Sequence, residues 1–569
     1  MAAAIKMFLS QIPDNLKTTE AEQEAEAIVK GMGCLPLGVQ AVVGLINEAG
    51  CSLRSYNEQW NNPRLVSKDS TALHVYRNSA PYEKALADVL FETLHSLDDD
   101  TWRMAEIFSL LDPDNIQEDL FLADKVEGNL RDVGYITNCV KCIGKLSKGL
   151  IGENNTQPGQ YYRSFHMHPL FQTCIQMKMI DEYRRAAVKA AAELLCTRID
   201  DAWELDWPKI REQSAKYFSH VRKVHKFYVE LADSNTVSNF DIPLSFIAML
   251  RKGAWLCYKR NFFRLGVVIL KTAENVLNQR REGFVLVGSQ DSIISETIQI
   301  CHTRACIESD IGNFTDSLKY FQLGLDYFNE GKKVGLHGFR RQTEKILYGG
   351  VVNSLNGLGQ DEEAESHYLK CIKLKHPDDP DPTYEINLNR CLWSQGPKRY
   401  QEASDSLLEI IAERERRFGV EDTKDDIPGH AFYVLGNLRI DQGRPDEAYE
   451  LHTKAFQNWE KTLGTEHHKT ADAYHKLGWH LSRKGDHLSA MDYLQSALDI
   501  YEGVQTKCSG EIARTTYKMS LVLQELGDNK EAKACLQTAE SIRQEILGDK
   551  YYTATGEESY NELVSIRAR

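Results

Sequence analysis

A repeat of 42 residues in the C-terminal third constrains this chain more than any other feature. Three series of small residues recur at that spacing: Gly443, Gly485 and Gly527; Ala448, Ala490 and Ala532; and Ala455, Ala497 and Ala539. A fixed period of this length is typical of a solenoid, in which each unit buries its apolar face only by stacking on its neighbours. The spacing therefore predicts an array of stacked units.

Each unit is predicted to contain two amphipathic helices. In "HAFYVLGNLRIDQGRPDEAYELHTKAFQNWEKTLG" the first helix ends near Gly443, because glycine is favoured just after a helix C-terminus, and the second begins after Pro445. Gly436, Ala448 and Ala455 lie where the two helices must approach closely, since a bulky side chain there would push the pair apart.

Weaker copies of the unit extend upstream. Gly312 and Gly359 mark two of them, Ala403 marks a third that lacks the turn glycine, and "AWLCYKRNFFRLGVVILKTAENVL" is a degenerate first copy. We expect six or seven units in an array that covers residues 245–569. An unrelated helical bundle is the alternative.

The chain before the array has a different pattern of predicted secondary structure. Residues 81–180 combine helices with short β-like runs, among them "VGYITNCV" and "YYRSFHMHPLFQ", and a turn is expected at Asp112-Pro113-Asp114. This order predicts a winged-helix domain over 81–180, after a helical segment over 1–80 and before a helical connector over 181–244. The expected fold class is mainly α.

Composition excludes several classes of function. The 569 residues carry 82 Asp and Glu against 68 Lys and Arg, a net charge of −14, which disfavours binding to a phosphate backbone. No apolar run is long enough for a membrane helix, and the N-terminus does not resemble a secretory signal. Thirteen cysteines without framework spacing indicate reduced thiols, so a cytoplasmic location is expected, with no nucleic-acid or membrane partner.

The first helices of the regular units supply the candidate binding residues. In a solenoid of helix pairs these helices line the concave face, and residues spaced by three and four positions share one side of a helix. Trp, Tyr and Arg, which dominate binding hot spots, occur there. The predicted groove for a protein or peptide partner consists of His430, Tyr433, Asn437, Asp472, His475, Trp479, Arg483, Arg514, Tyr517 and Leu521. The alternative is that any first-helix face contains such residues.

Both parts of the chain resemble known families. The repeats resemble tetratricopeptide repeats of the 42-residue kinesin light chain variety. "KGMGCLPLGVQAVVGLI", "FSLLDPDNIQEDLF" and "FHMHPLFQ" occur in the order seen in fungal NB-ARC proteins with tetratricopeptide arrays, which belong to the STAND class of NTPases. The resemblance implies that residues 1–80 are a remnant of the nucleotide module. It also implies that Pro36 matches an adenine-contacting proline and His168 a histidine that reaches the β-phosphate of ADP.

The phosphate loop of that family is missing from the sequence. Gly-Lys occurs at Gly144-Lys145 and Gly331-Lys332, but neither pair is followed by Ser or Thr or preceded by the required glycine. We therefore expect no cofactor. Binding of ADP or ATP is expected only if the chain is the regulatory part of a switch whose phosphate loop lies outside it.

Other constellations are weak. Cys139 and Cys142 form a lone Cys-x-x-Cys, interpreted as a strand with a thiol on either side of a turn, and His166 and His168 have no third partner for a metal ion. His467-His468 is interpreted as part of a polar loop between repeats. No catalytic motif is present, so no enzyme and no metal are expected.

The expected function is a non-catalytic scaffold or sensor that binds a partner along the repeats. Three alternatives stay open: the STAND nucleotide switch, an accessory protein of a fungal biosynthetic pathway, and a winged-helix regulator that binds DNA. The segment "IQEDLFLADKVEG" that would follow the turn at Asp112 is acidic, which disfavours the last of these. Self-association is also left open.

Overall fold

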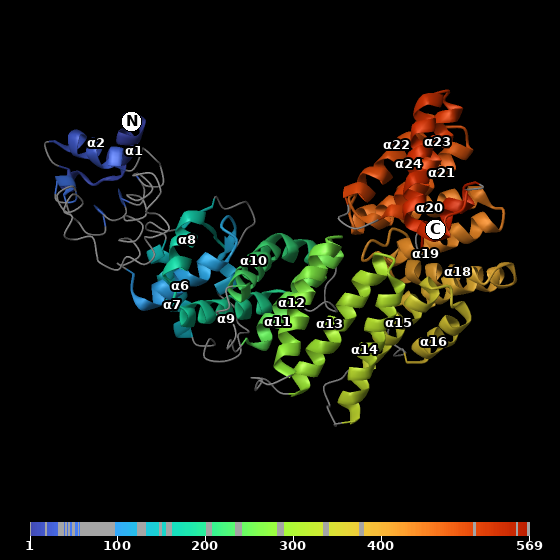
Figure 1. The fold of residues 1–569 in the computed structure, drawn as a ribbon, viewed down its shortest axis with the longest axis horizontal. Helices are drawn as coiled ribbons and strands as arrows, with labels where there is room; N and C mark the ends of the chain where they lie inside the picture. The colour runs from blue at the N-terminus through green and yellow to red at the C-terminus, as the bar shows by residue number, and fades with distance from the viewer. Residues whose placement is uncertain are drawn as a thin grey trace. The chain divides into compact units, whose positions relative to one another are not determined.

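The computed structural model divides into two compact units, residues 1–200 with 213–249 and residues 201–212 with 250–569. It describes residues 2–17, 20–31, 39, 42–43, 46–47, 52–54, 56, 97–121, 133–146, 151–154, 162–200, 207–233, 242–281, 290–333, 341–374, 381–503, 508–553 and 556–565. Helices dominate these residues, so the predicted mainly α class is confirmed (Figure 1).

The first unit contains helices and one small sheet. Its elements are α1 (Ala2–Gln11), η1 (Asp14–Leu16), α2 (Ala21–Gly31), α6 (Asp99–Leu110), β1 (Ile116–Gln117), η3 (Glu118–Phe121), α7 (Val133–Leu146), β2 (Ile151–Glu153), β3 (Ser164–Met167), α8 (Pro169–Lys178), α9 (Asp181–Arg198) and most of α10 (Trp207–Asp233).

The sheet is antiparallel, with β3 between β1 and β2. Ile116 lies opposite Phe165, and α6 covers this region by stacking Phe108 on Phe121 with ring centres 4.9 Å apart. α6 begins after Asp98, whose carboxylate accepts a hydrogen bond from the Thr101 backbone N–H at 3.0 Å and so caps the helix. The winged-helix assignment of this region stays a prediction.

The prediction of a β-like run at "VGYITNCV" was wrong, because these residues begin α7. The buried residues of its second half are Cys139, Cys142, Ile143 and Leu146, which follow helical spacing. An eight-residue window was too short to show that period. Cys139 and Cys142 therefore lie one helical turn apart on one face, not on either side of a strand turn.

The segment expected to be a connector packs closely within the first unit. The Tyr217 hydroxyl of α10 donates to Asp119 Oδ2 at 3.0 Å. His220 accepts the Asp112 N–H on Nδ1 at 2.9 Å and lies 3.0 Å from the Asn115 carbonyl through Nε2. Burial lowers the pKa of His220 to about 4, so a neutral imidazole holds the turn at Asp112.

Seven antiparallel helix pairs stack in the described part of the array (Figure 1). They are α11 (Leu244–Lys259) with α12 (Phe263–Arg281), α13 (Gln290–Asp310) with α14 (Phe314–Lys333), α15 (Arg341–Gly357) with α16 (Asp361–Leu374), α17 (Thr383–Ser394) with α18 (Tyr400–Phe418), α19 (Ile427–Asp441) with α20 (Pro445–Thr462), α21 (His468–Arg483) with α22 (His487–Gly503), and α23 (Ser509–Glu525) with α24 (Asn529–Leu547).

The small residues of the regular units lie where the two helices of a pair approach closely, as the sequence predicts. A Cβ at Gly436 would lie 2.5 Å from His452 Nε2, and one at Gly478 would lie 2.7 Å from Leu494 Cγ. Ala448 and Ala455 are fully buried on the facing helix. Larger side chains at these positions would separate the two helices of a pair.

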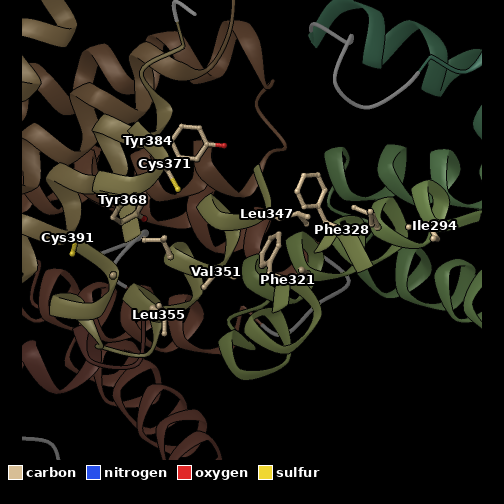
Figure 2. Close-up of a cluster of buried hydrophobic side chains, with 14 residues drawn as sticks. Ile294, Phe321, Phe328, Leu347, Val351, Leu355, Tyr368, Cys371, Tyr384 and Cys391 are labelled. Atoms are coloured by element: carbon tan, nitrogen blue, oxygen red, sulfur yellow. The ribbon is translucent and has the colours of Figure 1, made fainter. Parts of the chain in front are cut away.

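Core clusters are shared between neighbouring pairs. Figure 2 shows the cluster where α13 to α17 meet, with Phe321 and Phe328 of α14 beside Leu347 and Val351 of α15. Because this single cluster draws side chains from five consecutive helices, no pair completes its own core.

The unit marked by Ala403 has a turn glycine after all. Gly396 adopts φ 99° there, and the 3-10 helix η5 (Pro397–Arg399) follows it before α18 begins. This insertion moves the glycine to seven residues before Ala403, whereas Gly443 lies five before Ala448. The expectation of a missing glycine was therefore wrong because the spacing had changed.

The chain continues beyond α24 and packs onto the last pair. After η6 (Gly548–Lys550) and α25 (Glu558–Asn561), the Tyr560 ring stacks on Tyr517 of α23 with centres 4.1 Å apart. Arg543, which is fully buried, donates to the Ser559 carbonyl at 3.3 Å. We call the described residues 551–553 and 556–565 the C-terminal segment.

Candidate functional site

The array encloses a cavity of about 580 Å³, which we call the chamber. Six consecutive first helices, α13, α15, α17, α19, α21 and α23, supply most of its lining, and the second helices α14, α20, α22 and α24 supply a few residues. The ends of α11 and α12 and the C-terminal segment contribute as well. Among the lining residues are Tyr258, Phe263, Asp310, Asn353, Asn387, Arg390, His430, Asp472, Glu511 and Leu563. The chamber is thus the concave side of the solenoid.

Carboxylates dominate one part of the lining. Asp472 of α21 is 6% exposed and accepts a hydrogen bond from the Tyr501 hydroxyl at 2.6 Å. Burial raises the pKa of Asp472 to about 7, although the buried Arg514 opposes the shift. Burial also raises the pKa of Glu511, at the start of α23. Two carboxylates therefore lie in this part of the chamber with one guanidinium close to both.

A second group of charges surrounds Asp426. Lys469 Nζ donates to Asp426 Oδ2 at 3.2 Å and lies 2.9 Å from Nε2 of His430, which lines the chamber. Burial alone would raise the pKa of Asp426, but Lys469 and His430 hold it well below its usual value. Burial lowers the pKa of His430 to about 4, so the imidazole is neutral at pH 7.

The ten predicted groove residues do not share one surface. His430 and Asp472 line the chamber. Tyr433, Asn437, His475 and Arg514 are each less than 4% exposed. His475 of α21 has its Nδ1 3.0 Å from Thr515 Oγ1 of α23, so it packs between neighbouring first helices.

The remaining predicted residues lie elsewhere. Arg483 stacks over Trp479 at 4.8 Å, the C-terminal segment covers one face of Tyr517, and Leu521 is partly buried. Spacing by three and four positions selects residues on one side of each first helix. Some of these residues line the chamber, and others contact the next first helix. Two of the ten, His430 and Asp472, thus line the chamber, and the role of all ten in binding stays a prediction.

Sequence reasoning missed several residues of the chamber. One is His468, which was interpreted together with His467 as part of a polar loop. In the structure His467 is only 6% exposed, and its ring stacks on that of His468 with centres 4.5 Å apart. Lys469 and Tyr501 are others. The signal for Lys469 was its place at the start of a first helix, one turn before Asp472.

The residues matched to the nucleotide pocket are not brought together. Pro36 lies outside the described residues. His168 is exposed just after β3, and its carbonyl accepts the N–H of Phe171 at 2.9 Å at the start of α8. The nucleotide switch stays a prediction.

No group of three or more His, Cys, Asp or Glu side chains in the described part of the chain is placed to hold a metal ion. None of the described helices combines the length and the apolar character that crossing a bilayer requires.

Comparison with solved structures gives low similarities. Nearly identical TPR-like repeats of a kinesin light chain from Podosopora anserina are 18% identical, cover 36% of this chain and 98% of that one, and have a TM-score of 0.29. A STAND protein with a tetratricopeptide repeat sensor from Pyrococcus horikoshii is 12% identical, with 96% and 72% covered and a TM-score of 0.38. A Rap protein complexed with Competence and Sporulation Factor is 15% identical, with 65% and 95% covered and a TM-score of 0.41.

Comparison with family models identifies the repeats. The chain matches no curated protein. Residues 430–503 and residues 513–546 each match a tetratricopeptide repeat model. These ranges coincide with α19 to α24, where the spacing of 42 residues is regular. The last three helix pairs are therefore tetratricopeptide repeats.

Proposed function

We propose that this protein is a non-catalytic scaffold or sensor that holds a peptide segment of a protein partner in the chamber. The observation that carries the proposal is the cavity of about 580 Å³ along six first helices of the array. Ligand pockets commonly measure about 300–1,000 Å³, and the concave face is the surface that solenoids use for binding.

The charge of the lining indicates which peptide fits. Four carboxylates line the chamber, from Asp310, Asp472, Glu511 and Glu545, whereas the permanent cations there are Arg390 and Lys469. Lys469 is already paired with Asp426. His430 and His468 add no charge at pH 7, because burial lowers the pKa of each to about 4. Burial raises the pKa of Asp472 to about 7 and also raises that of Glu511, so a bound cation would favour the ionised form of both carboxylates. We therefore propose a segment that carries a Lys or Arg side chain or a free amino terminus.

A random peptide library screened on the full chain tests this proposal. The selected peptides should be cationic, and Glu511→Gln should weaken their binding about tenfold or more, because a desolvated charge pair would be lost. Glu409→Gln is the matched control, since Glu409 is exposed on the second helix α18 and does not line the chamber. Selection of acidic peptides, or equal binding by the two variants, would contradict the proposal.

A further inference from the structure

The turn between α11 and α12 differs from every other turn within a described helix pair. In the six later pairs the turn residue with positive φ is glycine, with φ between 73° and 99°. In the first pair it is Asn261, with φ 63°, the one described non-glycine residue in that region of φ. Asparagine tolerates this conformation better than most residues, so the turn keeps its shape and gains a side chain.

The Asn261 side chain reaches a helix far along the chain. Its Oδ1 lies 2.8 Å from Nδ1 of His468, at the start of α21 and 207 residues away. Because an amide oxygen only accepts, His468 is the donor. The Phe263 ring meets the same imidazole edge-on, with centres 5.9 Å apart. The first helix pair therefore contacts the sixth.

This contact closes the array into a ring around the chamber. Phe263 and His468 are themselves part of the chamber lining. Leu563 of the C-terminal segment also lines the chamber and lies against Gly510 at the start of α23. While the first and sixth pairs touch, they close one side of the chamber, and Leu563 of the C-terminal segment occupies part of its lining.

We propose that the contact of Asn261 and Phe263 with His468 is a latch that opens to admit a peptide from the side and closes over it. The proposal rests on the chamber being the binding site. The hydrogen bond joins neutral groups and the ring contact is a single edge-on pair, so each contributes little by itself, and Lys259 at the end of α11 adds an attraction to Asp426 before α19. A link made of a few such contacts permits both an open and a closed state. A peptide that contacts both sides of the closed ring then shifts the population toward closure.

The accessibility of Cys508 measures the latch without any peptide. Cys508 lines the chamber and is partly buried, and Cys535 on α24 is a partly buried thiol outside it. Alkylation of the full-length chain with iodoacetamide, followed by peptide mass mapping, gives a rate for each thiol. Asn261→Gly should raise the Cys508 rate at least threefold and leave the Cys535 rate unchanged. The substitution keeps the turn, because glycine occupies the other six.

Two further variants make the result decisive. Gly443→Asn places the same residue in a matched turn where a Cβ meets nothing within 4 Å, and should change neither rate. His468→Ala should raise the Cys508 rate as Asn261→Gly does, and the double variant should show no further increase. An unchanged Cys508 rate in both single variants with native circular dichroism, or additive effects in the double variant, would overturn the latch.

The outcome for the latch is separate from the outcome for the chamber. If no cationic peptide is selected, the proposed function fails, while the alkylation rates still decide whether the ring opens at Asn261. If peptides are selected, Asn261→Gly should increase their association and dissociation rates at least threefold, because access no longer waits for opening.

Discussion

The first and fifth helix pairs are built on the same plan, yet only the fifth is obvious in the sequence. In each, small residues follow the turn residue at offsets of 5 and 12, as in Gly443, Ala448 and Ala455 and in Asn261, Gly266 and Ala273. The turn residues adopt similar φ values of 73° and 63°. The difference is the Asn261 side chain, which contacts His468. A departure from the repeat consensus can thus mark a contact that the consensus residue cannot make.

The interface after the fifth pair should respond most strongly to acid. His452 and His480, both buried, face each other there at 2.9 Å, whereas the same positions at the first interface are Leu270 and Ile307. Burial lowers the pKa of His480 to about 3 and that of His452 well below its usual value. The unfolded chain therefore takes up protons near pH 6.5 that the folded chain refuses, so stability is present above that pH and is lost as the pH falls.

Replacing this pair with its neighbours' residues tests that difference. His452→Leu with His480→Val copies Leu494 and Val522 at the next interface. Thermal unfolding between pH 7.5 and 5.5 should show the natural chain losing about 2–3 kcal/mol more than the double variant. Equal losses would mean that the two imidazoles are not held neutral by the fold.

The next largest difference between the first and fifth pairs should be the stability lost when a methyl group is added at the close approach of their two helices. Gly436→Ala brings a methyl group against the His452 ring, which is itself held against His480, and should cost about 1–3 kcal/mol. Gly266→Ala meets the flexible end of Ile307 at 2.9 Å and should cost less than half as much. Urea unfolding of the two variants compares them, and a larger loss for Gly266→Ala would break the parallel between the pairs.

The buried carboxylate of Asp472 in the chamber should make stability depend on pH in the opposite direction to His452 and His480, and by a smaller amount. The raised pKa of Asp472 means that the folded chain disfavours its ionised form, so this residue's contribution to stability falls as the pH rises from about 4 through 7. Asp472→Asn should therefore stabilise the chain by about 1–2 kcal/mol more at pH 8 than at pH 5. Thermal unfolding at the two pH values measures this, and a gain that is the same at both would contradict it.

The turn residues themselves should matter least for stability. Asn261→Gly loses one hydrogen bond and gains backbone freedom in the unfolded chain, which together should cost about 1 kcal/mol. Gly443→Asn should change stability by less than that. Unfolding midpoints that drop by several degrees for Gly443→Asn would show that the later turns do not tolerate a side chain.

The sequence predicted those parts of the fold that depend on local spacing. The helix pairs and the close approach at Gly436 follow from residues that each unit repeats. The first pair was interpreted as degenerate because the search was for glycine, although Asn261 with Gly266 and Ala273 keeps the same offsets. The physical signal, a residue that tolerates positive φ, was present.

The chamber was less predictable, because it depends on how the array curves. His430 and Asp472 were found from helical spacing, but His475 on the same stripe turned out to pack against Thr515. Curvature comes from small rotations summed over several pairs, which one helix does not reveal. For the same reason the contact between Asn261 and His468, 207 residues apart, could not be read from either repeat alone.

Ring closure also limits how this protein can change its length. A solenoid ordinarily tolerates gain or loss of a whole unit, because each pair needs only its immediate neighbours. Here a duplication or deletion of one unit anywhere between Asn261 and His468 would carry the first pair past its partner or leave it short. The number of units in that interval is therefore fixed by geometry, while units added after α24 would leave the interval intact.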